Sequence, residues 1–250
     1  MNHPDRQQAQ RILSLLDLTN LQDDCTADDV VTLCHRARGS FGSTAAVCVW
    51  PRFVKIAREE LAQLAVEGPD IRLATVVNFP HGGTDIAAAV NEAEQCMRAG
   101  ANEIDCVLPY RALMAGDIET PSRLIDEVHR RVDGRAHLKV ILETGELSTA
   151  SMITAAARLA IDNGADFIKT STGKTPVSAT PEAGRLMLEV IAGADRPVGF
   201  KPSGGIRTIA DAQIYLDLAD EIMGPSWASP ATFRFGASGL LDAVLAVLQS

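Results

Sequence analysis

Cysteine, histidine and aromatic residues are all scarce in this chain of 250 residues. Phenylalanine, tyrosine and tryptophan together make up 4 % of it, so alanine, leucine, valine and isoleucine must supply most of the apolar core. The five cysteines form an odd set without a C-x-x-C pair, which argues against a disulfide framework and for a reducing compartment. The histidines show no metal-ligand spacing, and we therefore expect no metal site.

Positive charge and long apolar runs are also lacking. Lysine and arginine number 23 against 32 aspartates and glutamates, which gives a net charge of −9 and a pI near 5.0. Nucleic acids and anionic membranes are therefore not expected as partners. No apolar run approaches the roughly 18 residues of a membrane span, and the N-terminal MNHPDRQQAQR has no apolar signal core. We expect a soluble, cytoplasmic protein that binds small molecules.

Short apolar, β-branched runs alternate with helical patterns along the whole chain. The eight predicted strands are 14–19, 45–50, 71–79, 103–109, 137–144, 166–171, 197–202 and 233–238. The predicted helices are 27–38, 52–65, 85–100, 122–132, 149–164, 180–193, 208–219 and 238–249, with an extra helix at 5–16. Eight strand–helix units without a flexible linker predict one domain, 1–250, with the α/β fold of a (β/α)8 TIM barrel and an extra N-terminal helix. An open doubly wound sheet is the alternative, but the Gly-rich first turn that it would want is absent.

Two lysines at the ends of predicted strands are the strongest chemical signal. Lys169 lies in DFIKTSTGK (166–174) and Lys201 in PVGFKPSGG (197–205), each after an apolar run. The active sites of such barrels lie at the carboxyl ends of the strands, and these two strands would be neighbours. Repulsion between the two ammonium groups would disfavour protonation of one of them and leave a free amine to attack a carbonyl. The alternative is a purely structural role, in which each lysine pairs with a carboxylate such as Asp105 or Glu143.

Glycine-containing loops follow both lysines and the last predicted strand. Loops after the seventh and eighth strands are the common phosphate site of the barrel fold. The predicted phosphate-binding residues are Gly173, Lys174, Gly204, Gly205, Gly236 and Ser238. A lysine nucleophile beside such loops predicts a phosphorylated carbonyl compound as the substrate.

Whole segments of the chain resemble the 2-deoxyribose-5-phosphate aldolase family. The specific ones are EIDCVLPYRALMAGD (103–117), ADFIKTSTGK (165–174) and GFKPSGGIRT (199–208). The shorter matches are LLDLT (15–19), AAVCVWPRF (45–53), NFPHG (78–82), LKVILETGEL (138–147) and RFGAS (234–238). The resemblance therefore extends over essentially the whole chain, in order.

The resemblance implies a class I aldolase that needs neither metal nor cofactor. Such enzymes reversibly cleave 2-deoxy-D-ribose 5-phosphate to D-glyceraldehyde 3-phosphate and acetaldehyde, in deoxyribose phosphate catabolism. By position, Lys169 matches the Schiff-base lysine, and Asp105 and Lys201 match the residues that move protons. Asp17 is expected to position a substrate hydroxyl or a water. A homodimer is an assembly that such barrels often adopt.

Two departures from the family pattern carry expectations of their own. The chain ends at Gln249-Ser250 without the C-terminal tyrosine of some relatives, so no help from such a tail is expected. It also has Ser238-Gly239 where some relatives have two serines, which predicts weaker phosphate binding. Two other functions stay open: a lysine-dependent aldolase for a ketose phosphate or a keto acid, and a sugar-phosphate sensor without turnover.

Overall fold

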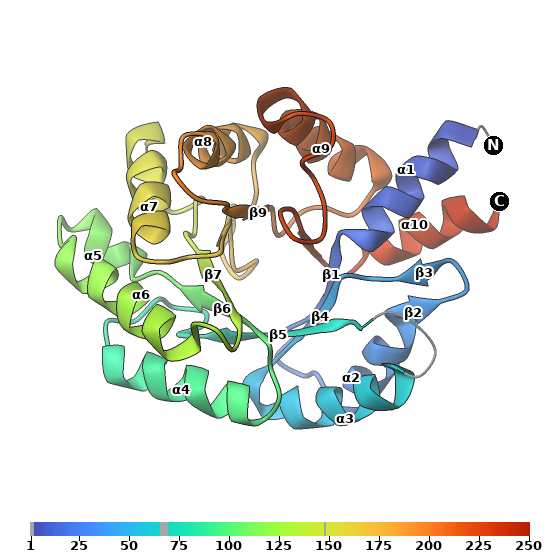
Figure 1. Ribbon diagram of the computed structural model, residues 1–250, viewed down its shortest axis with the longest axis horizontal. Coiled ribbons are helices and arrows are strands. Elements are labelled where there is room, and N and C mark those ends of the chain that lie inside the picture. Colours follow the sequence, from blue (N-terminus) through green and yellow to red (C-terminus); the bar gives the residue numbers. More distant parts are fainter. Residues whose placement is uncertain (1–2, 66–69, 148) are drawn as a thin grey trace.

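The chain folds into a ring of parallel strands surrounded by helices (Figure 1). The computed structural model describes residues 3–65, 70–147 and 149–250. The ring is formed, in sequence order, by β1 (Leu16–Asn20), β4 (Ala46–Val49), β5 (Arg72–Val77), β6 (Glu103–Val107), β7 (His137–Ile141), β8 (Phe167–Lys169), β9 (Gly199–Lys201) and β10 (Phe235–Ala237). Parallel bridges from Phe200 to Phe233 and from Ser203 to Gly236 close it between β9 and β10. The predicted (β/α)8 TIM barrel is confirmed.

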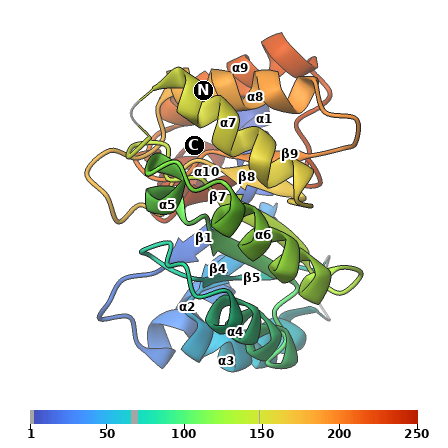
Figure 2. The same ribbon diagram turned by 90° about the vertical axis from the view of Figure 1, so that its left-hand side faces the viewer.

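Helices cover the outside of the ring, as the side view also shows (Figure 2). They are α2 (Ala27–Arg36), α3 (Val54–Leu64), α4 (Ile86–Arg98), α6 (Glu119–Val132), α7 (Ala150–Asp162), α8 (Pro181–Ala192), α9 (Ile209–Met223) and α10 (Leu240–Gln249). The extra helix is confirmed as α1 (His3–Ser14), and it packs against α10, so the first and last helices lie side by side (Figure 1).

Local sequence signals explain where several helices begin. Thr149, Thr180 and Thr208 each accept a hydrogen bond from a backbone N–H in the first turn of α7, α8 and α9. This capping satisfies a donor that the helix itself cannot pair. Thr26 does the same for α2, in a reciprocal capping box with Asp29.

Three small elements were not predicted. They are the hairpin of β2 (Arg38–Gly39) with β3 (Gly42–Ser43), the 3-10 turn η1 (Pro51–Phe53) and the short helix α5 (Tyr110–Met114). The predicted strand 71–79 is also too long, because β5 ends at Val77. Asn78 follows in the left-handed region, at φ 54°, and its side-chain amide donates to Val107 O and Gly83 O. The β2–β3 hairpin, η1 and α5 were missed because each is too short to show a periodic pattern in the sequence.

The apolar core lies mainly between the strands and the helices. The inside of the ring is different, because charged side chains from several strands are buried there. A buried charge is strongly unfavourable unless it is paired, so these side chains must compensate one another. This polar interior positions the candidate site.

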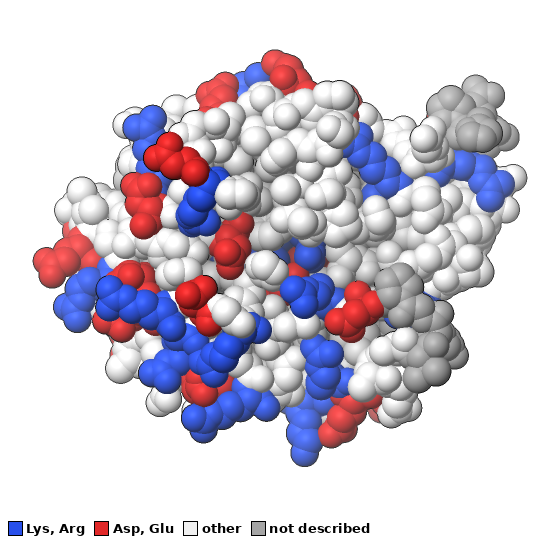
Figure 3. Space-filling model, viewed as in Figure 1, with Lys and Arg blue, Asp and Glu red and all other residues white. Residues whose placement is uncertain are grey.

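The outer surface in Figure 3 carries Lys and Arg intermingled with Asp and Glu. The arginines over α4 and α6 illustrate this: Arg98, Arg131 and Arg135 all lie within 4.0 Å of Glu94. In the part of the chain that the structure describes, no helix has the length and apolar character that crossing a membrane requires.

Candidate active site

Seven charged side chains meet inside the barrel, and none is more than 4 % exposed. They are Asp17, Glu103, Asp105, Lys139, Lys169, Lys201 and Arg234. We call this set the ion network. Asp105 is its centre: its Oδ1 accepts from Lys139 Nζ at 2.9 Å, and its Oδ2 accepts from Lys169 Nζ at 2.9 Å and Lys201 Nζ at 2.8 Å.

The two predicted lysines do stand side by side. Lys169 ends β8 and Lys201 ends β9, and the two residues are direct partners in the register of these strands. Their Nζ atoms contact the same carboxylate oxygen, Asp105 Oδ2. The predicted proximity, which rested on the order of strands in a barrel, is therefore confirmed.

The remaining contacts link the network across the ring. Arg234 donates to Asp17 Oδ1 at 2.7 Å and to Glu103 Oε1 at 2.8 Å. Lys139 Nζ lies 2.6 Å from Glu103 Oε2. Lys201 also contacts Asp17 Oδ2, so both carboxylate oxygens of Asp17 are engaged by cations.

Charge pairing outweighs burial in setting the protonation of Lys201 and Asp105. Burial alone would lower the pKa of Lys201, but the carboxylates of Asp105 and Asp17 raise it well above its ordinary value. Burial would raise the pKa of Asp105, yet Lys139, Lys169 and Lys201 together hold it well below its usual range. Lys201 therefore stays a cation and Asp105 a carboxylate around neutral pH.

Sequence reasoning missed Lys139, Glu103 and Arg234. A signal existed for Glu103, because it lies two positions before Asp105 in the same strand, and alternate residues of a strand point to the same side. Lys139 pairs in register with Asp105, which no pattern in the sequence reveals. Arg234 directly precedes β10 and reaches Glu103 of a strand far along the chain.

A cavity of about 680 Å³ opens beside the strand ends. It is lined by Thr19, Leu21, Gln22, Thr172, Gly173, Lys174, Ser203, Gly204, Gly205, Ile206, Arg207, Gly236, Ala237, Ser238 and Gly239. All six predicted phosphate-binding residues are in this lining, so the structure brings them together. Asp17, which was predicted to contact the substrate, does not line the cavity. It belongs to the ion network and is 0 % exposed, two residues before the cavity-lining Thr19 in the same strand.

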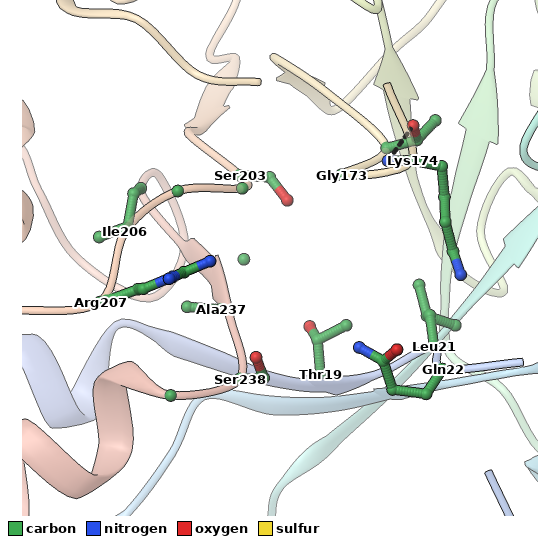
Figure 4. A pocket seen from close by; sticks show the side chains of 15 residues that line it. Thr19, Leu21, Gln22, Gly173, Lys174, Ser203, Ile206, Arg207, Ala237 and Ser238 are labelled. Atoms are coloured by element: carbon green, nitrogen blue, oxygen red, sulfur yellow. Dashed lines mark hydrogen bonds between the residues drawn. The ribbon is translucent and has the colours of Figure 1, made fainter. Parts of the chain in front are cut away.

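Two cations reach the cavity from opposite sides, as Figure 4 shows. Lys174 extends towards Leu21 (Figure 4), and its Nζ lies 2.9 Å from Asp23 Oδ1. Arg207, which was not among the predicted site residues, points in from the other side (Figure 4). Its signal was present in the sequence, since it is the cation at the end of the Gly-Gly loop, residues 202–207.

Two cavity glycines, Gly204 and Gly236, are required because neighbouring atoms come very close. A Cβ on Gly236 would lie 2.5 Å from Ser203 Oγ and 3.2 Å from Lys201 Cε. A Cβ on Gly204 would lie 2.6 Å from Ser178. The amide of Gly236 already donates to Pro202 O, so this glycine serves the cavity by its missing side chain rather than by a free N–H.

Cys48 lies in the barrel at 0 % exposure, packed with Leu21, Ala74 and Val76. Burial raises the pKa of its thiol to about 11. At pH 8 the thiol is therefore protonated in the folded protein, and we expect iodoacetamide to alkylate it at least about tenfold more slowly than in urea. Peptide mass spectrometry of both samples measures this, and equal labelling at Cys48 would contradict the buried position.

Comparison with known proteins agrees with this geometry. The family described as DeoC/LacD family aldolase matches residues 11–243. A deoxyribose-phosphate aldolase of Agrobacterium fabrum (strain C58 / ATCC 33970) is 54 % identical over 245 residues, which cover 97 % of this chain and 92 % of the relative.

Solved structures share the fold. An apo structure from Toxoplasma gondii ME49, assigned as a deoxyribose-phosphate aldolase, superposes with a TM-score of 0.91 at 28 % identity, covering 99 % of this chain and 98 % of the other. The deoxyribose phosphate aldolase of Aeropyrum pernix, at 23 % identity, has a TM-score of 0.76 over 100 % of this chain and 98 % of its own, which supports the fold alone. The family match covers nearly the whole barrel, and with it the ion network and the cavity lining. The chain therefore belongs to the DeoC/LacD family of aldolases and is a lyase that acts on a carbon–carbon bond.

Proposed function

We propose that the chain reversibly cleaves 2-deoxy-D-ribose 5-phosphate to D-glyceraldehyde 3-phosphate and acetaldehyde through a Schiff base on Lys169. The observation that carries this proposal is the pairing of Lys169 and Lys201 on one oxygen of Asp105, close to a cavity with two cations. Thr172, three residues after Lys169, already lines the cavity. An amine and an anion-binding cavity are thus placed for one phosphorylated substrate.

The charge balance of the ion network favours Lys169 as the nucleophile. The cations Lys139, Lys201 and Arg234 match the three carboxylates of the network, and the pKa of each of these cations is raised by those carboxylates in spite of burial. A fourth buried cation at Lys169 would leave an excess positive charge without a matching carboxylate, which is unfavourable away from water. Among the residues that the structure describes, Lys169 also has a single carboxylate partner, whereas Lys201 has two. We infer that Lys169 is the amine that reacts in its neutral form.

The proposed reaction begins when Lys169 Nζ adds to the C1 aldehyde of the open-chain sugar. Loss of water from the carbinolamine gives an iminium, whose positive charge lies beside Asp105 and is stabilised by it. A base removes the C3 hydroxyl proton, the C2–C3 bond breaks, and its electron pair enters the iminium to form an enamine. D-glyceraldehyde 3-phosphate leaves; protonation of C2 and addition of water then release acetaldehyde and restore Lys169.

We assign the proton movements to Asp105, working through a water, and to Lys201. Asp105 is an ionised acceptor, and Lys201 is a cation that contacts the same oxygen as Lys169. These two groups can exchange protons with a water at that position without a metal ion or an organic cofactor. The phosphate of the substrate is bound in the cavity, where Lys174 and Arg207 supply positive charge. Gly239, the N-cap of α10, also lines the cavity, so the N-terminus of this helix faces the phosphate.

One experiment tests the reaction directly. The protein is incubated with 2-deoxyribose 5-phosphate, reduced with borohydride, and digested for mass spectrometry. The chain has five lysines, Lys55, Lys139, Lys169, Lys174 and Lys201, and fragmentation of the peptide distinguishes an adduct on Lys169 from one on Lys174. We expect a reduced adduct on the peptide that contains Lys169. Adducts with ketose phosphates or keto acids instead would indicate another lysine-dependent aldolase, and binding without any adduct would indicate a sensor.

Replacing Gly239 by serine is expected to tighten phosphate binding. Gly239 lines the cavity and caps α10 without a side-chain hydrogen bond, and a Cβ added there would meet no atom within 4 Å. Its φ of −82° suits any residue. A serine would add a hydroxyl to the cavity, and we expect the KM for 2-deoxyribose 5-phosphate to fall about two- to fivefold. Gly239→Ala is the control, and an equal fall in both variants would exclude the hydroxyl as the cause.

Location and assembly are further parts of the proposal. A cytoplasmic location is supported by the five buried, unpaired cysteines. Homodimer formation and the action of residues 1–250 as one domain stay predictions. Light scattering coupled to size-exclusion chromatography measures the first, and coincident unfolding transitions by two spectroscopic probes measure the second.

A further inference from the structure

Glu143 is a buried carboxylate outside the ion network. It follows β7, is 0 % exposed, and adopts a left-handed backbone conformation with φ 57°, which is unusual for a residue other than glycine. It forms no ion pair with any of the residues that the structure describes. A buried carboxylate without a cation is held only if strong hydrogen-bond donors surround it.

The donors to Glu143 all come from one loop after β8. Thr172 donates its hydroxyl to Oε2 at 2.5 Å and its backbone N–H to Oε1 at 3.2 Å. Thr175 Oγ1 lies 3.3 Å from Oε1 and shares its single proton between Glu143 and Val177 O, which is closer at 3.0 Å. Both carboxylate oxygens therefore accept hydrogen bonds from this loop, residues 172–175.

The same hydrogen bonds extend to the cavity. The Thr172 hydroxyl donates a hydrogen bond to Glu143, and its Oγ1 accepts one from the backbone N–H of Lys174 at 3.0 Å. Thr172, Gly173 and Lys174 all line the cavity. Gly173 lies between the two bonded residues at φ 77°, so its backbone depends on how they are held.

The loops after β7 and β8 also touch directly. A Cβ added to Gly145 would lie 2.1 Å from Val177 O and 2.9 Å from Val177 Cβ. The loop that carries Glu143 is thus packed against the loop that it holds, and a substitution at Gly145 would push the two apart. This contact gives a second, independent means of moving the phosphate-binding loop.

We propose that Glu143 is a positioning residue that orients loop 172–175 for the phosphate group, and that it thereby determines the preference for phosphorylated substrates. The identity of the substrate in this proposal rests on the proposed function, whereas the role of Glu143 rests on its hydrogen bonds to the loop. Glu143 acts through Thr172 and is not among the residues that line the cavity. Its loss should therefore affect binding of the phosphate far more than the chemical step.

The test compares Glu143→Gln with the wild type and with Glu146→Gln. Glu146 is a carboxylate of the same loop, and in the described part of the chain its side chain makes no hydrogen bond to residues 172–175. The kcat and KM are measured with 2-deoxyribose 5-phosphate and with unphosphorylated 2-deoxyribose, and inorganic phosphate is tested as an inhibitor. Circular dichroism and thermal melting confirm that each variant is folded at the assay temperature.

We expect Glu143→Gln to raise the KM for the phosphorylated substrate and the inhibition constant of phosphate by about tenfold. The kcat for 2-deoxyribose should change by less than about twofold, and Glu146→Gln should behave as the wild type. Gly145→Ala should reproduce the KM effect. An equal loss on both substrates, or an unchanged KM, would overturn the proposal.

Direct titration of inorganic phosphate separates this proposal from the proposed function. If the wild type cleaves neither substrate, the proposed function fails, but weaker phosphate binding by Glu143→Gln would still support the positioning role. If the wild type cleaves 2-deoxyribose 5-phosphate and both proteins bind phosphate equally, the positioning role fails and the proposed function stands.

Discussion

The Lys169→Leu variant is expected to lose at least about 10⁴-fold in turnover of 2-deoxyribose 5-phosphate, because the covalent route disappears with the amine. The fold should persist. Leucine is similar in length to the buried stem of lysine, and Asp105 keeps Lys139 and Lys201 as partners when the Lys169 amine is removed. Steady-state kinetics measure the loss, and borohydride reduction in the presence of substrate should leave the protein mass unchanged.

Lys55→Leu provides the matched control for this result. Lys55 lies exposed on α3, away from the ion network, so the same chemical change there should leave both kcat and the borohydride adduct intact. The dissociation constant of inorganic phosphate, measured by direct titration, should also agree between Lys169→Leu and the wild type, since the amine is not part of the cavity lining. Substantial turnover by Lys169→Leu would assign the nucleophile to another lysine.

Replacing Lys201 by leucine is expected to lower kcat by about 10²- to 10⁴-fold at neutral pH and to move the rise in activity to higher pH. The pKa of Lys201 is raised by Asp105 and Asp17 in spite of burial, so this side chain is a cation throughout the working range. Its charge disfavours protonation of the neighbouring Lys169. Without it, the repulsion between two neighbouring positive charges, which favours the neutral amine that attacks the carbonyl, is lost.

A pH profile of kcat/KM distinguishes this role from simple destabilisation. Lys201→Arg retains the positive charge and should keep the rise in activity near that of the wild type, even if its rate is lower. Lys174→Leu removes a cation from the cavity and should raise the KM without moving the profile. An unmoved profile for Lys201→Leu, in a variant whose melting curve confirms a folded state, would reject the proposed effect of Lys201 on Lys169.

The barrel was predictable because each of its units carries its own local signal. Apolar runs alternate with amphipathic helices, and threonines mark the starts of α7, α8 and α9. Strand order in a barrel follows chain order, so the adjacency of Lys169 and Lys201 also followed from the pattern. The elements that were missed, such as α5 and the β2–β3 hairpin, are too short to form a period.

The ion network could not be predicted in full because its contacts depend on side chains that cross the ring. Glu103 and Arg234 are separated by 131 positions and meet only because β6 and the start of β10 face the same interior. Lys139 looked like one residue of an apolar strand, yet it neutralises Glu103 and Asp105. Glu143 was considered as a lysine partner, whereas it binds threonine hydroxyls and an amide.

By itself, the sequence determined the barrel, the pair of lysines and the loops around the cavity, because these depend on periodicity and on the order of residues along the chain. The tertiary structure alone decided which charges neutralise one another, that Asp17 lies in the ion network, and that Arg207 reaches the cavity. The physical reason is that a buried charge is compensated by whichever opposite charge packing brings within about 3 Å, whatever its position in the chain.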